Sequence, residues 1–598
     1  MSAPTDAPPS GRRRIAFTAI MLLVPLLLLG SVELALRAAG HGQLPPLFIS
    51  HPQHPEWSLA NPAVIERFVS HPKQAPRISI ETGFFRTEKN AGALRLVVQG
   101  GSSAAGFPYG YGASLAGMLE QRLRREFPGR EIEVVTTAMS AVNSWALREF
   151  VPEIIAIQPD AVLIYAGHNE YLGLLGVGSA YTVSASALLT RLVMRLRHLR
   201  TYRLLEGFMA GRLAGAGPVA GADGTLMARV AAQRRIPLYS PLYHAGVAQL
   251  EDNMRAILAG YRAGGIPVFV ATLASNERDQ PPFESDEPAA ARESLQEVAA
   301  MLAAGDTAGA LAAAEAVQAA HPGSAQAWFR LAEALAAAGR EAEAVAAWRH
   351  ARDLDQLRFR APSEFNDVLQ RLADESGATL VDVAASFRAH SPFGAIGAEL
   401  MLEHLHPSLD GYFLLADAFH AALVEAGVAG ARSAAIPAEQ ARRELPLSRA
   451  EELFGEYKLL RLKNDWPFAD PPRETVLPPA QGLEDELAQA LYRQQIDWAR
   501  MQDRLKQHYR AQGNRDEYLR LALILADAFP FIAAAQRDAG EALRAAGRPM
   551  QAVRYLHRAT TYAPDDTQAL RAFAEVARSV GLDTLAERAE ERLRRLQP

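Results

Sequence analysis

The chain of 598 residues contains no cysteine. Disulfide bonds, thiolate nucleophiles and cysteine-ligated zinc or iron–sulfur sites are therefore excluded. The chain also lacks an excess of either charge, since 62 lysines and arginines stand against 67 aspartates and glutamates. A strongly basic chain is typical of nucleic-acid binding, so the composition indicates no nucleic-acid partner. The length exceeds what one hydrophobic core supports, and about three or four domains are expected.

One long uncharged run, residues 15–32, follows three consecutive arginines near the N-terminus. At about 1.5 Å per residue it would span roughly 27 Å, close to the thickness of a bilayer core. The arginines favour retention of that end in the cytoplasm. We expect a cytoplasmic tail (1–14), a transmembrane anchor in the inner membrane (15–36) and the bulk of the chain outside the cytoplasm. A signal peptide cleaved near residues 38–40 is the alternative.

Apolar runs with strand character alternate with helical patterns through the middle of the chain. The expected strands are residues 94–99, 131–135, 160–166, 266–273 and 379–383, and the expected helices are 113–127, 146–158, 247–263 and 364–375. This alternation predicts a parallel sheet covered by helices on both faces. The expected fold class is a flavodoxin-like three-layer α/β/α domain.

Polar loops follow three of these strands, and a fourth polar loop comes late in the chain. They are residues 100–106, which hold Ser102, and residues 136–144, 167–171 and 403–407. Ligands of open α/β sheets bind at the carboxyl ends of the strands. In the fourth loop an acid stands three residues before a histidine, a spacing that lets the carboxylate orient an imidazole, which then takes the proton of a serine hydroxyl. An ordinary strand-to-helix turn is the plain alternative for Ser102.

These four loops, in this order, resemble the sequence blocks of the SGNH/GDSL family of serine hydrolases. The resemblance covers residues 94–284 and 359–430. Five positions depart from the family pattern: Gly101 replaces the usual aspartate, Thr136 and Ala141 replace an asparagine and a glycine, and Glu170 and Glu403 each replace an aspartate. Glutamate serves as the acid in other serine–histidine–acid enzymes, so we expect Glu403 to be compatible with activity.

The resemblance implies roles for five residues. Ser102 is the expected nucleophile, His406 the base and then the acid, and Glu403 the residue that orients His406. The backbone N–H groups of Ser102 and Ala141, with the amide of Asn169, are the expected oxyanion hole. The resemblance implies neither a metal nor an organic cofactor.

Three further residues near these motifs have alternative interpretations. His404 is a rival base, but the following Pro407 and Gly-Tyr pair favour His406. His168 and Gly101 are candidate substrate contacts, and packing within a loop is the alternative for both histidines.

The resemblance implies a serine esterase that acts on O-acyl esters of carbohydrate or lipid. Together with the expected membrane anchor, it favours substrates of the cell envelope. An O-acyltransferase that uses the same acyl-enzyme is an alternative. A catalytically weak assembly protein of the envelope is a second alternative, from another class.

A repeat of 34 residues interrupts the hydrolase-like region and returns at the C-terminus. Gly305 and Gly339 are 34 residues apart, as are Gly513, Gly547 and Gly581. Together with small residues in phase, this period predicts all-α tetratricopeptide repeats that bind a protein partner. The expected domains are a stalk or cap (37–93), the hydrolase (94–284 and 359–430), inserted repeats (285–358), a connector (431–498) and C-terminal repeats (499–598).

Residues 187–209 combine leucines with arginines at helical spacing. A basic amphipathic helix can lie on an anionic membrane or bind an acidic partner. It can also form a lid over Ser102. We favour a helix packed on its own domain with a solvated arginine face.

Overall fold

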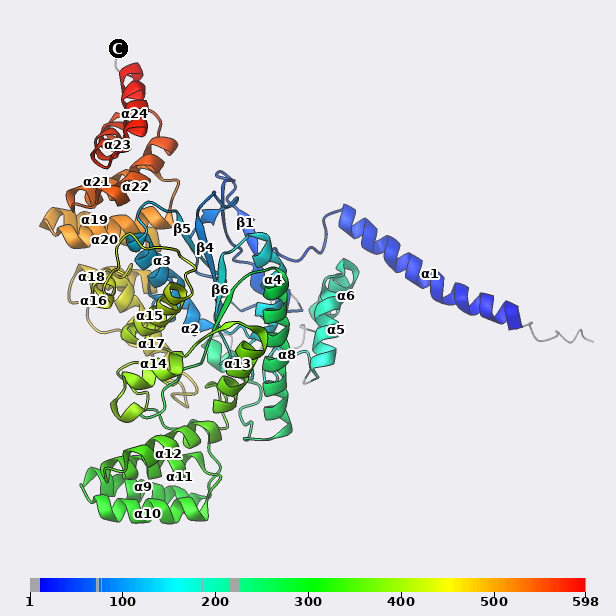
Figure 1. Cartoon of the computed structure of the whole chain (residues 1–598). Coiled ribbons are helices and arrows are strands. Elements are labelled where there is room, and N and C mark those ends of the chain that lie inside the picture. Colours follow the sequence, from blue (N-terminus) through cyan, green and yellow to red (C-terminus); the bar gives the residue numbers. More distant parts are fainter. Residues whose placement is uncertain (1–10, 71–74, 77, 185, 214–224, 597–598) are drawn as a thin grey trace, which may run out of the picture.

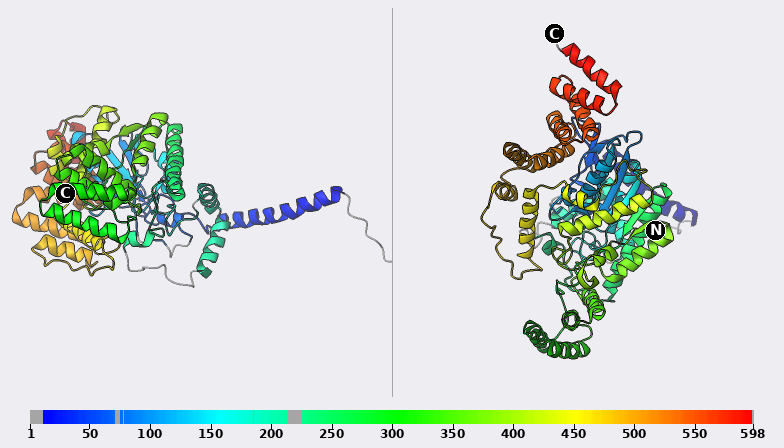
Figure 2. Two further views of the ribbon diagram at one scale, coloured as in Figure 1. Left: turned by 90° about the horizontal axis from the view of Figure 1, so that it is seen from below. Right: turned by 60° about the vertical axis from the view of Figure 1, so that its left-hand side comes forward.

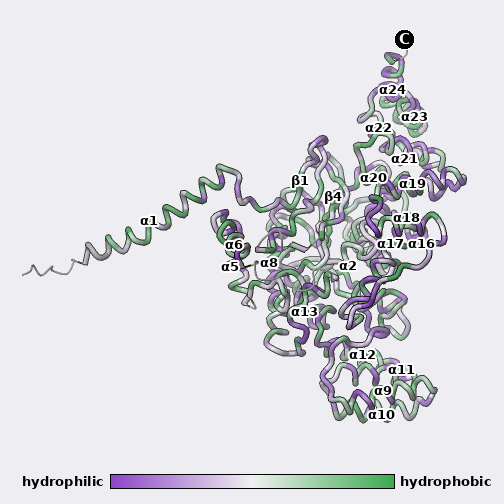
Figure 3. Tube along the Cα trace, turned by 180° about the vertical axis from the view of Figure 1, so that it is seen from behind, coloured by the Kyte–Doolittle hydropathy of each residue, from purple (hydrophilic) through white to green (hydrophobic). Residues whose placement is uncertain are grey.

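The computed structural model describes residues 11–70, 75–76, 78–184, 186–213 and 225–596. In that part, a central α/β body carries two groups of helices at opposite ends (Figure 1). An N-terminal helix, α1 (Gly11–Ala38), extends away from the body. The apolar segment Phe17–Ala38 (Figure 3) contains an 18-residue stretch with a mean hydropathy of 2.4, none of which is buried. It is long and apolar enough to cross a membrane, a property that signal sequences share.

The body is built on a parallel sheet with the strand order β5-β4-β6-β7-β8 in the described residues. The strands are β4 (Leu94–Gly100), β5 (Ile132–Thr136), β6 (Ala161–Tyr165), β7 (Val268–Ala271) and β8 (Thr379–Val381). The first strand of this sheet, β4, lies between the second and the third, and Val98 pairs with both Thr136 and Leu163. The expected α/β body with a parallel sheet is thus confirmed, and its switch point lies beside β4.

Helices cover both faces of the sheet. On one side α3 (Leu115–Glu126) packs against α15 (Leu409–Glu425). On the other side α8 (Pro241–Ala263) packs against α4 (Ser144–Ala156) and α13 (Ser363–Ser376). The strands between these layers are buried on both faces, which explains why their sequences are apolar runs without alternation.

Two polar residues of β4 are buried with their hydrogen-bonding groups paired. Arg95 forms an ion pair with Glu133 of β5 at 2.7 Å and donates to the carbonyls of Arg86 and Ile157. Gln99 accepts from the hydroxyl of Tyr261 at 2.8 Å. A buried polar group is tolerated when it is paired, so these residues fix neighbouring elements to β4.

Residues 37–93, the expected stalk or cap, pack against the body in their described part. They contain an antiparallel sheet of β1 (Phe48–Ser50), β2 (Trp57–Ala60) and β3 (Phe85–Arg86). Leu47, Phe68 and Phe85 are buried in the same hydrophobic core as the parallel sheet. This segment is therefore a packed part of the body.

The inserted helices form a separate bundle below the body in Figure 1. They are α9 (Ala289–Ala303), α10 (Thr307–Ala320), α11 (Ala325–Ala337) and α12 (Glu341–Leu354), with a hydrophobic core of their own. Asp355 joins the two ends of the insertion, because its carboxylate accepts the N–H groups of Phe283 and Glu284 at 3.1 Å and pairs with Arg360 at 2.8 Å. The insertion thus leaves and re-enters the body at one point. Its assignment as tetratricopeptide repeats stays a prediction.

The C-terminal helices contact the other end of the body (Figure 2). They are α19 (Trp498–Gln512), α20 (Arg515–Ala528), α21 (Ala533–Ala545), α22 (Pro549–Tyr562), α23 (Thr567–Ser579) and α24 (Asp583–Leu596). The hydroxyl of Tyr562 accepts from the Trp57 indole at 2.5 Å, and Arg558 pairs with Glu131 at 3.1 Å.

The expected connector, residues 431–498, also belongs partly to the body. It contains α16 (Ala438–Arg443), α17 (Arg449–Lys463) and α18 (Leu483–Tyr492). Leu445, Leu447 and Trp466 lie in the core that surrounds the parallel sheet. The carbonyl of Pro446 lies 2.1 Å from the position that a Cβ on Gly112 would take. This part of the connector therefore packs on the body.

The close approach of Gly112 to Pro446 gives a test of this packing. We expect Gly112→Ala to lower stability by about 1–3 kcal/mol, because a rigid backbone carbonyl blocks the added methyl group. The thermal unfolding midpoint of the purified full chain measures the change. Gly129→Ala is the matched control, since no atom lies within 4 Å of its added Cβ. Equal midpoints for the two variants would contradict the docking of the connector.

Candidate active site

Ser102 stands at the carboxyl end of β4, as the first residue of the short helix α2 (Ser102–Ala105). Gly101 precedes it in an extended conformation, so the chain turns sharply between the strand and the helix. The side chain of Ser102 lies inside the fold, with 8% of the residue exposed. As a first-turn residue of a helix, it has a backbone N–H with no partner inside the helix.

His406 and Glu403 complete a hydrogen-bonded chain that ends at Ser102. The Nε2 atom of His406 lies 2.8 Å from the Ser102 hydroxyl oxygen. The Nδ1 atom of His406 is hydrogen-bonded to the Glu403 carboxylate. With Nδ1 protonated toward the carboxylate, Nε2 is free to accept the serine proton. The three residues thus have the arrangement of an activated serine nucleophile.

A closed turn holds Glu403 in place. Met401 and Pro407 form a β-bridge, and the N–H of Leu402 donates to the carbonyl of His406 at 2.8 Å. Inside this turn the Glu403 carboxylate accepts the N–H groups of Leu405 and His406 at 3.0 and 2.8 Å. Burial opposes the charge of Glu403, but His406 outweighs it and the pKa of Glu403 falls to about 2. The carboxylate is therefore ionised at neutral pH.

Tyr412 and Phe107 fix the imidazole relative to the serine. Tyr412, in the first turns of α15, donates its hydroxyl to the carbonyl of Phe107 at 2.5 Å. The ring of Phe107 packs against His406, with 4.6 Å between ring centroids. Because Phe107 closely follows the nucleophile in the chain, this contact couples the two halves of the site.

Asn169 brings the third loop to the serine turn. Its side-chain amide donates to the carbonyl of Val142 at 2.9 Å and lies 2.8 Å from the position of a Cβ on Gly101. The strand order explains this meeting, because β5 and β6 flank β4 and their carboxyl ends lie beside its own. Asn169 thus lies beside the serine turn, and its role as an oxyanion donor stays a prediction; one such donor is worth about 2.7–4 kcal/mol in a transition state.

Ala141 has the left-handed backbone conformation that usually requires glycine. Its φ is 60°, and its carbonyl accepts the N–H of Leu174 at 2.7 Å. For a residue with a Cβ this conformation costs on the order of 1–2 kcal/mol. The alanine therefore takes a backbone conformation that suits glycine, at a cost in local strain.

The two neighbouring histidines are buried and uncharged. Burial lowers the pKa of both His168 and His404 to about 3. His404 is stacked on Phe283 at 3.6 Å between centroids, and its Nε2 donates to the carbonyl of Pro281. These contacts favour His406 over His404 as the base. His168 accepts the N–H of Ala361 at Nδ1, and its contact with substrate stays a prediction.

Glu170 lies behind the oxyanion loop, outside the hydrogen-bonded chain of the site. It accepts the N–H and the hydroxyl of Ser144 at 2.7 and 2.8 Å and the amide of Gln249 at 2.9 Å. Burial raises the pKa of this carboxyl to about 7. Its position next to Asn169 makes it a support for the loops that carry the oxyanion donors.

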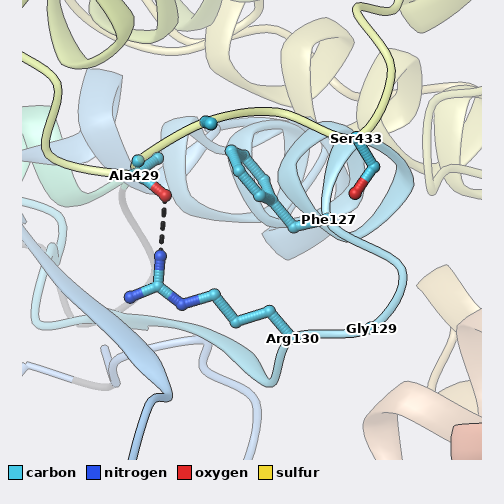
Figure 4. A pocket seen from close by; sticks show the side chains of 7 residues that line it. Phe127, Gly129, Arg130, Ala429 and Ser433 are labelled. Atoms are coloured by element: carbon cyan, nitrogen blue, oxygen red, sulfur yellow. Dashed lines mark hydrogen bonds between the residues drawn. The ribbon is translucent and has the colours of Figure 1, made fainter.

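Two other observations bear on the chemistry of the molecule. Within the described ranges, no group of three or more histidine and acidic side chains is arranged to hold a metal ion. A cavity of about 350 Å³ lies at the C-terminal end of α3, lined by Phe127 and Arg130 (Figure 4). Arg130 donates there to the carbonyl of Ala429 at 2.7 Å. None of the residues that line it belongs to the chain of hydrogen bonds at Ser102.

Comparisons with known proteins give partial structural likenesses. No family model and no curated protein matches the chain. Among solved structures, a lipase/acylhydrolase from Enterococcus faecalis is 14% identical, over 56% of this chain and 96% of its own, with a TM-score of 0.26. A catalytic mutant of Axe2, an acetylxylan esterase from Geobacillus stearothermophilus, is 16% identical, over 57% of this chain and 97% of its own, with a TM-score of 0.26. An acetyl xylan esterase named AlAXEase is 11% identical, over 55% of this chain and all of its own, with a TM-score of 0.26.

Sequence motifs identified the residues of the hydrogen-bonded chain but not those that pack around it. For Phe107, the one sequence signal of a place near the site was its closeness to Ser102 in the chain. No sequence signal pointed to Phe468, because it lies in a proline-rich connector far along the chain. It packs edge-on against Phe283, with 5.1 Å between the ring centroids.

Removal of the Glu403 charge tests the hydrogen-bonded chain. We expect Glu403→Gln to slow reaction of Ser102 with an activated ester by about 10⁴-fold, because the imidazole loses its orienting carboxylate. Stopped-flow or steady-state hydrolysis measures the rate. Glu399→Gln is the control, since Glu399 lies four residues earlier and pairs with Arg278 at 2.6 Å instead. A similar loss of rate in both variants would contradict a role for Glu403 in orienting His406.

Titration of Glu170 predicts a pH dependence of stability. The folded-state pKa of about 7 exceeds the ordinary value of 4.5, so the contribution to stability is fully present below pH 4.5 and is lost as the pH rises through 7. Between pH 5 and 8.5 we expect the wild type to lose about 2–3 kcal/mol relative to Glu170→Gln. Unfolding midpoints across this range measure it. Parallel pH profiles for the two proteins would show that Glu170 does not titrate there.

Proposed function

We propose that the protein is a serine esterase that acts on O-acyl esters through an acyl-enzyme on Ser102. The observation that carries this proposal is the 2.8 Å contact of His406 Nε2 with the Ser102 hydroxyl, with Glu403 behind the imidazole. Structural neighbours that are named esterases and acylhydrolases are in keeping with this chemistry.

The first half of the reaction acylates the serine. The Ser102 oxygen attacks the ester carbonyl carbon while its proton passes to His406 Nε2. The negative oxygen of the tetrahedral intermediate lies toward the N–H groups of Ser102 and Ala141 and the amide of Asn169. When the intermediate collapses, the bond to the alcohol oxygen breaks and His406 gives its proton to the departing alcohol.

The second half releases the acyl group by the same steps. A water molecule replaces the alcohol, His406 removes its proton, and the acid leaves with Ser102 restored. A sugar hydroxyl in place of water would instead produce a new ester, which is acyl transfer.

The substrate proposal rests on the placement of the chain. We propose that α1 anchors the protein in the inner membrane and that the body lies outside the cytoplasm, which would place Ser102 near acylated carbohydrate or lipid of the cell envelope. The three arginines before the apolar run support this orientation. The two groups of helices are the proposed surfaces for a protein partner.

Hydrolysis by matched serine variants tests the proposed activity. We expect the purified full chain to release acid from 4-nitrophenyl acetate and from acetylated glycans, and Ser102→Ala to lower kcat by at least about 10⁴-fold. Ser103→Ala, which alters the adjacent buried serine, should keep kcat within about tenfold, because Ser103 lies outside the hydrogen-bonded chain.

The reaction products distinguish the three proposed functions, which are ester hydrolysis, acyl transfer and an assembly role with little catalysis. Free acid whatever acceptor is added supports hydrolysis, and an acylated glycan product shows transfer. A wild type no faster than Ser102→Ala on every ester would leave the assembly role as the better account.

A further inference from the structure

Helices α5 (Ala187–Arg197) and α6 (Arg200–Leu213) form a hairpin with apolar side chains on its outside. The exposed apolar residues are Leu188, Leu189, Leu192, Leu199, Leu204, Leu205, Phe208 and Met209, which are 42% to 74% exposed. Eight exposed apolar side chains on two adjacent helices are more than the singly scattered ones that a soluble surface usually carries. The sequence favoured a helix packed on its own domain with a solvated arginine face; Met194 of α5 does lie in the core of the body, but these leucines are exposed.

The inner side of the hairpin meets the body, where Met194 is buried in the core around the parallel sheet. Thr190 and Arg197 are buried, and Arg197 pairs with Glu206 of α6 at 2.8 Å. Arg197 also donates to the hydroxyl of Ser70. A hairpin that hides an ion pair and exposes leucines is suited to surroundings that are less polar than water.

The hairpin is fixed to the end of α1 by reciprocal capping. Glu33 of α1 accepts the N–H and the hydroxyl of Thr201 at the start of α6, both at 2.9 Å. Arg200 donates to the carbonyls of Leu36 and Arg37 at the end of α1, at 2.9 and 3.1 Å. An anion at a helix N-terminus and a cation at a C-terminus both match the helix dipoles, so these contacts set how α1 leaves the body.

The position of the hairpin matches the surface of a bilayer that α1 would cross. In both Figure 1 and Figure 2, α5 and α6 lie crosswise to α1, beside its C-terminal end and between it and the body. Residues 187–213 contain six arginines and one glutamate. This excess of positive charge favours anionic headgroups.

We propose that the α5–α6 hairpin lies in the interface of the membrane that α1 spans, with its leucines and Phe208 among the acyl chains and the exposed Arg195 and Arg212 at anionic headgroups. This proposal rests on the proposed anchoring by α1 and is independent of the chemistry at Ser102. Two contacts with the membrane, one spanning and one interfacial, hold the body at a fixed height and orientation above the lipid surface.

The absence of cysteine allows a direct test by single labels. Leu192→Cys and Leu205→Cys place an environment-sensitive fluorophore on the hairpin in the full chain. Val476→Cys is the matched control, because Val476 is an exposed apolar residue of the connector, and Leu27→Cys marks the middle of α1. Each labelled protein is reconstituted in vesicles of phosphatidylcholine and phosphatidylglycerol, with and without a quencher attached to the acyl chains.

We expect lipid quenching at positions 192 and 205 to be several-fold stronger than at position 476. Quenching at position 27 together with control-level quenching at 192 and 205 would overturn the hairpin proposal and leave the anchor intact. Control-level quenching at position 27 as well would overturn the anchor too. Hairpin labels that are shielded from water but not quenched would indicate a protein cover, such as a second copy of the chain, and would also overturn the proposal.

Discussion

The hydrogen bond between Ser102 and His406 joins residues that are 304 positions apart in the chain. The distance between His406 Nε2 and the Ser102 hydroxyl oxygen can change little, because proton transfer between these two atoms requires hydrogen-bond contact. The sheet fixes Ser102 at the end of its first strand, and α15 fixes His406 through Tyr412, which donates to Phe107 beside the nucleophile. The closed turn around Glu403 then holds the imidazole in one tautomer. These constraints explain why the polar groups of the site are buried and paired.

A helical bundle is inserted between the two halves of this site without separating them. Asp355 accounts for this, because its carboxylate binds the backbone where the insertion leaves and its arginine partner lies just after the chain re-enters. Residues of the connector pack into the same core from the other side. The body is thus one folded unit made from segments that are distant in sequence, with helices added at its two ends.

The sequence predicted the features that local patterns encode. Buried parallel strands appear as apolar runs, so the predicted bounds of β4 and β6 agree closely with those of the structure. The spacing of Glu403 and His406 indicated an oriented imidazole. The sequence marked Ala141 as a replacement for a glycine, but its left-handed backbone was known only from the structure. Long-range packing was not predictable: Leu445 and Trp466 lie in a proline-rich stretch, and nothing local shows that they join the core. The sequence did not show whether the side chain of Leu205 faces the protein or points outward. The apolar residues of a helix recur with the same period whether their face meets protein or lipid.

The central claim is that Ser102 is a nucleophile activated by His406. The most direct measurement is peptide mapping by mass spectrometry after reaction of the full chain with a fluorophosphonate, which esterifies activated serines. The account predicts one adduct on Ser102, absent in His406→Ala. No adduct, an adduct on Ser103, or undiminished labelling of His406→Ala would contradict it.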